Sequence, residues 1–151
     1  MEMKTLKKIF TLVLIIVGIG VASLTDAAAQ SLRDGNYNYI GKILPNGTVR
    51  NERYVAIGFF NGDGTIADRH GKMQGRVSTS ELAIYDDDGK RIGFLTTDGR
   101  VFDGESVQLG SIDRNSGKVT ELDDGEEKTI GYAHGVSMLW IAAYYFFDFF
   151  D

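Results

Sequence analysis

Near its middle the chain reads Ile92-Gly93-Phe94-Leu95-Thr96-Thr97-Asp98-Gly99-Arg100-Val101-Phe102-Asp103 and then reaches Leu109-Gly110. This stretch is typical of a small β-hairpin, because apolar residues stand on both sides of the turn signal Thr97-Asp98-Gly99. The chain repeats this pattern before and after it. We therefore predict the fold from this unit outward.

The repeat is marked by a glycine that follows an apolar residue or, once, a glutamine. The six pairs are Ile40-Gly41, Ile57-Gly58, Gln74-Gly75, Ile92-Gly93, Leu109-Gly110 and Ile130-Gly131. Their glycines are 17, 17, 18, 17 and 21 positions apart. Self-similarity at a nearly fixed period indicates a repeat architecture. The sequence therefore predicts five hairpin units of about 17 residues.

The turn length predicts which side chains face one another. A three-residue loop with a left-handed last residue sets the apolar residues on its two sides directly opposite, on one face. The expected pairs are Ile43 with Val49, Phe60 with Ile66, Leu95 with Val101 and Ile112 with Val119, and the third unit offers Val77 with Ile84 or Ala83. In the fifth unit the turn is one residue longer and Val119 moves by one place, which favours hairpins over coincidence.

The start of the chain is typical of a secretory signal peptide. Basic residues precede an apolar run from Ile9 to Ala22, and Ala27-Ala28-Ala29 offers a cleavage site. Residues 1–29 are the expected leader, and residues 30–151 the expected single domain of 122 residues. An uncleaved anchor is the alternative, although the run is shorter than the roughly 20 residues of a membrane-spanning helix.

Composition narrows the compartment and the partners. With no cysteine, the chain has no disulfides and no lipidated cysteine after the leader, so we expect a periplasmic or extracellular product. Its 16 basic and 21 acidic residues give a net charge of −5. The basic residues are scattered among the turns, which argues against nucleic acid as a partner.

The tail differs in character from the repeats. From Val136 to Phe150 it is apolar almost all round and has no turn residues until Asp148. A helix of this kind must be buried on most sides, although the aromatic content would also suit a strand. Because each hairpin carries too few apolar residues to fold alone, we predict five hairpins around or against a helix over residues 136–150. Ser31 to Asn38 is expected to be a polar lead-in, with Tyr37 and Tyr39 at the edge of the first strand.

The pattern resembles the five-fold β-flower family, small exported proteins of Bacteroidetes. The resemblance rests on the Ile-Gly pairs, on the turns Asp63-Gly64-Thr65-Ile66 and Asp98-Gly99-Arg100-Val101, and on Ala142-Ala143 in the tail. Gln74-Gly75 and Ser80-Glu81 depart from it in the third unit. The resemblance implies a mainly β fold and an exported location, and it implies no catalytic residues.

One circle of oxygen ligands is conceivable. The polar position after each hairpin holds Asn51, Asp68, Asp86, Asp103 and Glu121. In a closed ring these residues would suit a hard cation such as calcium, and we treat the last four as candidate calcium ligands. The simpler interpretation, which we favour, is that each starts a turn, since turns demand Asp or Asn there.

The other candidate groups point to chemistry less clearly. Asp86-Asp87-Asp88 and Asp123-Asp124 lack the spacing of a calcium-binding loop, and we expect solvated turns. His70 and His134 have no second histidine at ligand spacing, so neither a metal nor a general base is expected. Tail aromatics such as Trp140 could stack on a sugar if they face outward, although core packing is the stronger interpretation for most of them. Phe149 and Phe150 could meet a partner or membrane if the helix outruns the ring.

Three functions remain open at this stage. The first is a non-enzymatic exported binding or interaction module for a protein or glycan of the cell envelope, with no cofactor expected. The second is a membrane-apposed structural protein that docks through the aromatic tail. The third is a hydrolase that uses two carboxylates on glycan, which requires an acid pair in one cleft.

Overall fold

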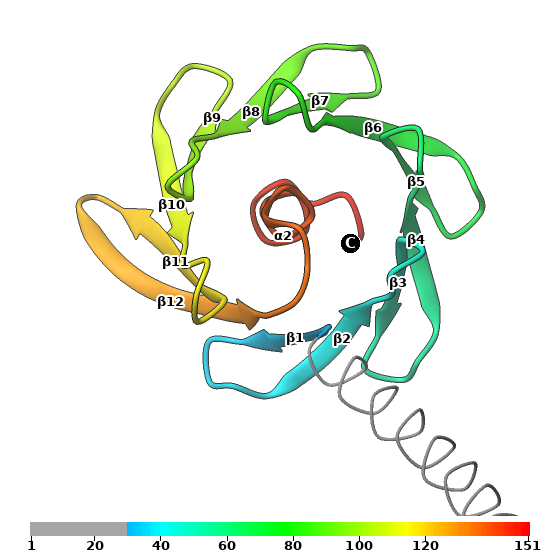
Figure 1. Cartoon of the computed structure of the whole chain (residues 1–151), viewed down its shortest axis with the longest axis horizontal. Coiled ribbons are helices and arrows are strands. Elements are labelled where there is room, and N and C mark those ends of the chain that lie inside the picture. Colours follow the sequence, from blue (N-terminus) through cyan, green and yellow to red (C-terminus); the bar gives the residue numbers. More distant parts are fainter. Residues whose placement is uncertain (1–29) are drawn as a thin grey trace, which may run out of the picture.

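The structure is a computed structural model that describes residues 30–151, so the expected leader lies outside the described residues. Twelve antiparallel strands form a closed ring in which each strand pairs with its neighbours in sequence, and β1 pairs with β12. One helix, α2, lies inside the ring (Figure 1). The predicted class, a mainly β repeat fold around an apolar C-terminal helix, is confirmed.

The strands are short, and two turns of different kinds alternate between them. Their bounds are β1 Ser31–Asp34, β2 Tyr39–Ile43, β3 Thr48–Asn51, β4 Ala56–Phe60, β5 Thr65–Asp68, β6 Met73–Ser78, β7 Ala83–Asp86, β8 Arg91–Leu95, β9 Arg100–Asp103, β10 Gln108–Ile112, β11 Lys118–Asp123 and β12 Glu126–Ala133. The five predicted hairpins are β2–β3, β4–β5, β6–β7, β8–β9 and β10–β11. A second set of turns joins β1 to the first hairpin and each hairpin to the strand that follows it. We call the turns inside the hairpins the hairpin turns and those of the second set the linking turns.

The predicted register is confirmed in all five hairpins. Ile43 lies opposite Val49, Phe60 opposite Ile66, Val77 opposite Ile84, Leu95 opposite Val101 and Ile112 opposite Val119. All ten side chains are buried. The third hairpin, whose sequence departs from the pattern, keeps the same pairing because Leu82 takes the left-handed conformation that glycine supplies elsewhere (φ 52°).

The expected polar lead-in is wrong, because Ser31 to Asp34 forms β1. This strand pairs with β2 on one side and with β12 on the other, and so closes the ring. Leu32, which lies in it, is fully buried. A single apolar residue among polar ones gives no local strand signal, and the partner strand comes from the other end of the chain.

Each repeat glycine follows a β-bulge. The register shifts by one residue at each of Ile40, Ile57, Gln74, Ile92, Leu109 and Ile130. A bulge adds an unpaired residue and increases the local bend of the strand. The five apolar bulge residues pack against the core. The apolar-Gly pairs that mark the repeat are therefore the places where the wall of the ring bends.

Hydrogen bonds from each hairpin turn to the following hairpin join neighbouring units. The carbonyl of Gly47 accepts from the N–H of Phe60 at 2.8 Å, and the carbonyl of Gly64 accepts from Val77 at 2.8 Å. Leu82, Gly99 and Gly117 repeat the contact with the next unit. A Cβ on Gly47 would run into the Phe60 carbonyl. Glycine thus serves this turn through both its positive φ and its lack of a side chain.

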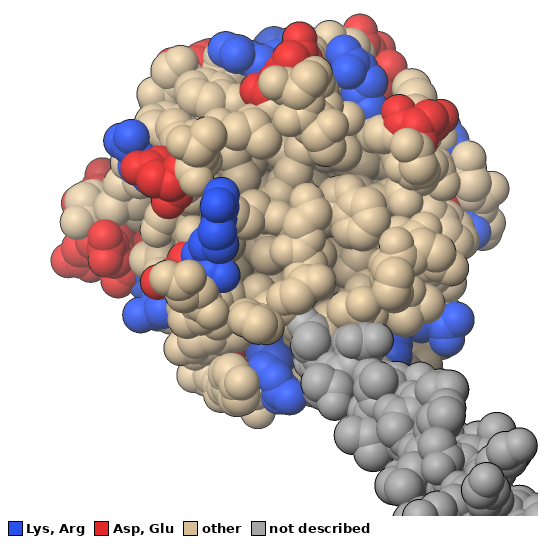
Figure 2. All heavy atoms as spheres, in the orientation of Figure 1, with Lys and Arg blue, Asp and Glu red and all other residues tan. Residues whose placement is uncertain are grey.

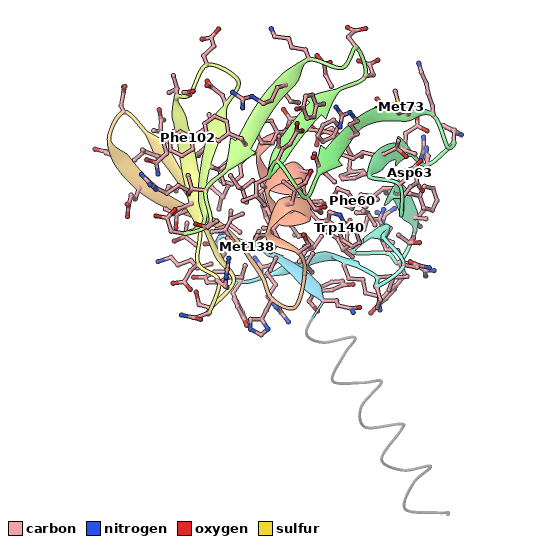
Figure 3. All side chains as sticks on the ribbon, turned by 45° about the horizontal axis from the view of Figure 1, so that its top comes forward. Phe60, Asp63, Met73, Phe102, Met138 and Trp140 are labelled. Atoms are coloured by element: carbon pink, nitrogen blue, oxygen red, sulfur yellow. The ribbon has the colours of Figure 1, made fainter. Side chains whose placement is uncertain are left out.

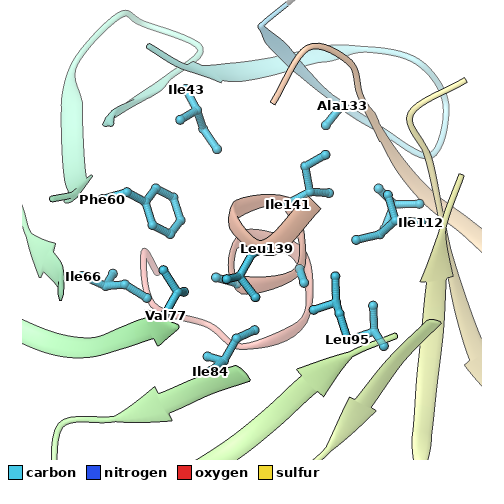
Figure 4. Packing of buried hydrophobic residues seen from close by; sticks show 14 of the residues in the cluster. Ile43, Phe60, Ile66, Val77, Ile84, Leu95, Ile112, Ala133, Leu139 and Ile141 are labelled. Carbon is cyan, nitrogen blue, oxygen red and sulfur yellow. The ribbon is translucent and has the colours of Figure 1, made fainter. Parts of the chain in front are cut away.

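The helix α2 spans Met138–Phe146 and lies at the centre of the core, where Leu139, Ile141, Ala142 and Ala143 are buried (Figure 4). The tail is helical, as predicted, but the helix is shorter than the expected range 136–150. It ends because Phe147 leaves the helical conformation (φ −127°, ψ 13°) and Asp148 has a positive φ of 51°. No helix among the described residues is long and apolar enough to cross a membrane.

The aromatic end of the chain explains the repeat glycines. A Cβ on five of them would collide with a tail ring: Gly58 with Phe150, Gly75 with Phe149, Gly93 with Phe147, Gly110 with Phe146 and Gly131 with Tyr145. After Asp148 the chain turns along the inside of the ring, where the C-terminus lies (Figure 1). One ring therefore occupies the space that each of these five glycines leaves free.

Candidate functional site

The polar residues proposed as a calcium circle lie at equivalent places in the ring. Asn51, Asp68, Asp86, Asp103 and Glu121 are directly opposite the repeat glycines Gly41, Gly58, Gly75, Gly93 and Gly110. Asp34 takes the sixth place, opposite Gly131. The sequence had not indicated this sixth member, because β1 was not expected to be a strand.

Five of these six side chains cap the linking turns. In Asp68, Oδ1 accepts from the N–H groups of His70 at 2.8 Å and Lys72 at 3.0 Å. Asp34, Asn51, Asp86 and Asp103 make the same two contacts two and four residues ahead. The backbone N–H of Lys72 donates to the Asp68 carboxylate and so holds its pKa below the usual value.

Within residues 30–151, the acidic residues that approach one another closely enough for one cation are Asp86, Asp87 and Asp88. Asp86 already caps a turn, and the other two are exposed. Glu121 lies within β11 and is exposed, while Asp124 and Gly125 form a two-residue turn. The structure therefore gives every circle position except Glu121 a turn-capping role and does not bring the circle together around one ion.

The histidines and the last phenylalanines lie apart from this chemistry. His70 is exposed in the linking turn between β5 and β6, and His134 is exposed just after β12. Phe149 and Phe150 are half-buried and, with Asp68, His70 and the last residue Asp151, line a hollow of about 390 Å³. The helix does not outrun the ring to present these two rings, because the chain turns back at Asp148.

A second hollow, of about 370 Å³, forms where two neighbouring hairpin turns meet the helix. The turn after β4 contributes Asn61 to Gly64, β6 and the turn after it contribute Arg76 to Ser80, and α2 contributes Trp140. Figure 3 shows Phe60, Trp140 and Asp63 close to one another beside α2. Trp140 stacks on Phe60, with ring centroids 4.9 Å apart and an angle of 8°. One face of the indole is thus fixed by the wall, and the half-buried ring also borders the hollow.

The polar groups around Trp140 hold one another in place. Asp63 Oδ1 accepts a hydrogen bond from the Thr65 N–H at 2.9 Å. The side-chain hydroxyl of Thr65 accepts one from Asn61 Nδ2 at 3.0 Å. The Thr65 hydroxyl also donates to Asp63 and so lowers the pKa of this carboxyl. Ser78 and Ser80 share a hydrogen bond of 3.3 Å between their hydroxyls. Over α2, the middle of the face seen in Figure 2 is largely uncharged, with the charges around its rim.

Sequence reasoning identified Trp140 as a possible sugar platform but missed its polar surroundings. Asn61 to Gly64 are turn residues by every local signal, and Ser78 and Ser80 belong to no motif. They come together because consecutive hairpins stand side by side around the helix. The 17-residue spacing of the units was the one available signal, since residues one repeat apart occupy neighbouring turns.

The chain was compared with known proteins. The family model described as 5-fold beta-flower protein matches residues 29–150. Neither the curated proteins nor the solved structures gave a significant match.

Proposed function

Because the chain belongs to the 5-fold beta-flower protein family, whose description names a fold and no reaction, we propose that it is a non-enzymatic binding module. In this proposal the protein is exported to the cell envelope and holds a saccharide in the hollow beside Trp140. The fold supports such a role, since a closed ring around a rigid core displays its turns in fixed positions. The signal-peptide pattern of residues 1–29 is the basis for the export.

The single observation that carries the proposal is the aromatic ring among short polar side chains. Ligand pockets commonly combine an aromatic surface with a few fixed hydrogen-bonding groups. An indole stacked on Phe60 offers a flat apolar face, which suits the C–H face of a pyranose ring. Asn61, Ser78 and Ser80 offer donors and acceptors around it, as sugar hydroxyls require.

Binding is favoured over hydrolysis by the carboxylates present. Glycosidases that use two acids hold them about 5 to 9.5 Å apart across the scissile bond. The lining of the Trp140 hollow contains one carboxylate, Asp63, whose Oδ1 is bonded to Thr65. The acid also has a lowered pKa, which is the wrong direction for a general acid at neutral pH.

Trp140 is the one tryptophan of the chain, so its fluorescence reports on the hollow directly. A panel of neutral oligosaccharides, including peptidoglycan fragments, should contain a ligand that shifts the emission saturably. The Asn61→Ala and Ser80→Ala variants should weaken that ligand about tenfold, which corresponds to about 1.4 kcal/mol. Asn115→Ala, in an exposed turn outside the hollow, is the control. Silence across the panel in fluorescence and calorimetry, or an equal loss in the control, would reject the proposal.

A further inference from the structure

The outer wall of the ring carries basic charge without an acidic partner at ion-pair distance on its first three strands. Alternation along the strands puts Arg33, Lys42 and Arg50 on the face opposite the buried Leu32, Ile43 and Val49. The three lie on the neighbouring strands β1, β2 and β3, and all are half-buried. Within residues 30–151, the one ion pair joins Arg100 to Asp98, at 3.2 Å, on another part of the wall.

This arrangement costs stability. Lys42 lies directly opposite Arg50 in the β2–β3 pairing. Like charges directly opposite each other in a sheet are destabilising. The side-chain Nε of Arg50 and the hydroxyl of Tyr39, on the adjacent strand, are buried and have no hydrogen-bond partner within the described residues. Burial without such a partner is unfavourable for both groups.

Two exposed tyrosines in unfavourable backbone conformations flank these bases. Tyr37 and Tyr54 have φ values of 69° and 62° and are 60% and 62% exposed. The equivalent places in the next three linking turns hold Gly71, Gly89 and Ser106. A bulky residue is costly in the left-handed region and tends to be retained where it has a role. The first two linking turns thus differ from the next three in exposed aromatic surface.

Arginine fixes each tyrosine. The guanidinium of Arg33 lies 4.5 Å from the centroid of the Tyr37 ring and donates to the Tyr37 carbonyl at 3.0 Å. Arg50 donates to the Tyr54 carbonyl at 3.4 Å. Tyr54 in turn lies 6.2 Å from Tyr39, centroid to centroid. We call Arg33, Lys42, Arg50, Tyr37, Tyr39 and Tyr54 the arginine–tyrosine cluster.

Another part of the wall holds a similar group of arginine and tyrosine side chains that has its own carboxylate partner. Across β6, β7 and β8, Arg76, Tyr85 and Arg91 lie in one row, and Arg76 stacks 3.9 Å from the centroid of Tyr85. There the Tyr85 hydroxyl donates to Glu81 at 2.8 Å. Both arginines also act on Glu81 and help to lower its pKa, although the Tyr85 bond is the main cause. The arginine–tyrosine cluster has the same residue types and lacks such a carboxylate.

We propose that the arginine–tyrosine cluster is a binding site for an anionic saccharide, with the basic side chains on its sulfate, phosphate or carboxylate group and the exposed tyrosine rings against the sugar. Guanidinium groups match the geometry of such oxyanions and bind them with charge-assisted hydrogen bonds. The ligand supplies the negative charge that the row at Tyr85 receives from Glu81. The site is separate from the Trp140 hollow and does not depend on it.

The surroundings favour a short anionic sugar over a long polyanion or a membrane. Asp34 and Glu52 lie at the two linking turns that follow β1 and β3, and the whole chain has a net charge of −5. A nucleic acid running along the ring would meet these acidic turns, whereas a short ligand stays over three strands. Lipid docking calls for a larger apolar patch than two tyrosine rings with polar tips and the neighbouring exposed Val55.

The test is calorimetric titration of the purified protein with a sulfated oligosaccharide, its neutral parent and inorganic sulfate alone. We expect binding of the sulfated sugar and at least tenfold weaker binding of the other two. Lys42→Gln should weaken the sulfated sugar about tenfold. Its thermal midpoint should stay equal or rise, because the repulsion with Arg50 is relieved. Arg91→Gln removes the same charge from the row whose Tyr85 bonds to Glu81, and it should leave the affinity unchanged.

A second pair of variants separates binding from folding. Tyr54→Gly should remove ring contact and relieve the backbone, so affinity falls about fivefold while the midpoint is kept or raised. Ser106→Gly relieves the same conformation (φ 66°) in another unit and should not alter affinity. Equal binding of the neutral sugar, equal losses in Arg91→Gln, or no binding at millimolar concentrations would overturn the proposal. So would binding limited to duplex DNA or to anionic phospholipid vesicles, which serve as additional probes.

Discussion

The hydroxyl of Tyr145 donates a hydrogen bond to the backbone carbonyl of Arg33, 2.7 Å away, and so ties the last helix to the first strand. The same hydroxyl lies 3.3 Å from the carbonyl of Tyr132 in β12. Its ring covers Gly131, which pairs with Asp34 of β1. The tail thus fastens the one strand pair that joins the two ends of the ring.

Replacing Tyr145 with phenylalanine should weaken this fastening. The variant keeps the ring over Gly131 but loses the hydrogen bond, and a buried carbonyl is left with one partner fewer. We expect the free energy of unfolding in urea to fall by about 1 kcal/mol. Tyr144→Phe is the control, since its hydroxyl makes no hydrogen bond within residues 30–151. Equal losses in both variants would argue against a fastening role.

High pH should act on the same group. Burial raises the pKa of Tyr145 well above that of an exposed tyrosine, which is about 10. Because the folded state holds the proton more tightly, this contribution to stability is complete below about pH 10 and is lost as pH rises beyond it. Tyr39 and Tyr144 also have raised pKa values through burial. Between pH 9 and 11, the unfolding free energy of Tyr145→Phe should therefore fall less steeply than that of the unmodified chain, but it should still fall.

The fit of rings to glycines can be tested at Gly93. A Cβ there would collide with the Phe147 ring and would lie 2.9 Å from the carbonyl of Phe102, and neither the packed ring nor the backbone can easily yield. Overpacking of this kind costs about 1 to 3 kcal/mol, so Gly93→Ala should lower the unfolding free energy by that amount. Gly62→Ala, where no atom lies within 4 Å of the added Cβ, should be nearly neutral.

Combining Gly93→Ala with Phe147→Leu distinguishes a ring clash from backbone strain. A smaller side chain at position 147 should recover part of the loss, and the double-mutant cycle should show favourable coupling of at least about 0.5 kcal/mol. Additive losses would mean that the Phe102 carbonyl, and not the ring, requires the glycine.

The sequence predicted the hairpins and their register because both follow from local turn length. Ile112 and Val119 pair across a longer turn for the same reason that Ile43 and Val49 pair across a shorter one. It could not predict β1, since the other side of that strand is filled by residues about 100 positions away. It also could not explain five of the six repeat glycines, because the rings that cover them come from the tail, as Phe150 does over Gly58.

The proposed binding surfaces were harder to predict than the fold. Arg33 and Lys42 look like scattered surface charges in the sequence, and only the register places them on one face without a carboxylate. Trp140 was noted as part of an aromatic tail, yet its polar neighbours come from two different turns. Both surfaces depend on the order in which the hairpins stand around the ring, which no single unit contains.

Acid should act on the capped turns. The Lys72 N–H bond lowers the pKa of Asp68, so its contribution to stability is present above about pH 4 and is lost as pH falls through the lowered value. Asp68→Asn keeps the Oδ1 acceptor, as Asn51 does in the same place one unit earlier. We expect Asp68→Asn to be close to the original stability at pH 7 and to lose less than the original between pH 5 and 2. Asp68→Ala should be less stable at both ends of that range. Parallel pH profiles for all three proteins would contradict this role of the carboxylate.

Calcium provides the sharpest test between the two interpretations of the acidic circle. The Oδ1 atoms of Asp68, Asp86 and Asp103 already accept two backbone N–H groups each, and a cation would have to compete for them. Calcium sites collect six to eight oxygens around one ion, whereas these carboxylates are spread around the ring, each at the end of its own hairpin. We therefore expect millimolar calcium to leave the thermal midpoint unchanged, with magnesium as the control for ionic strength. A calcium-specific rise that disappears in Asp103→Asn, which can still cap its turn, would show instead that the circle binds the ion.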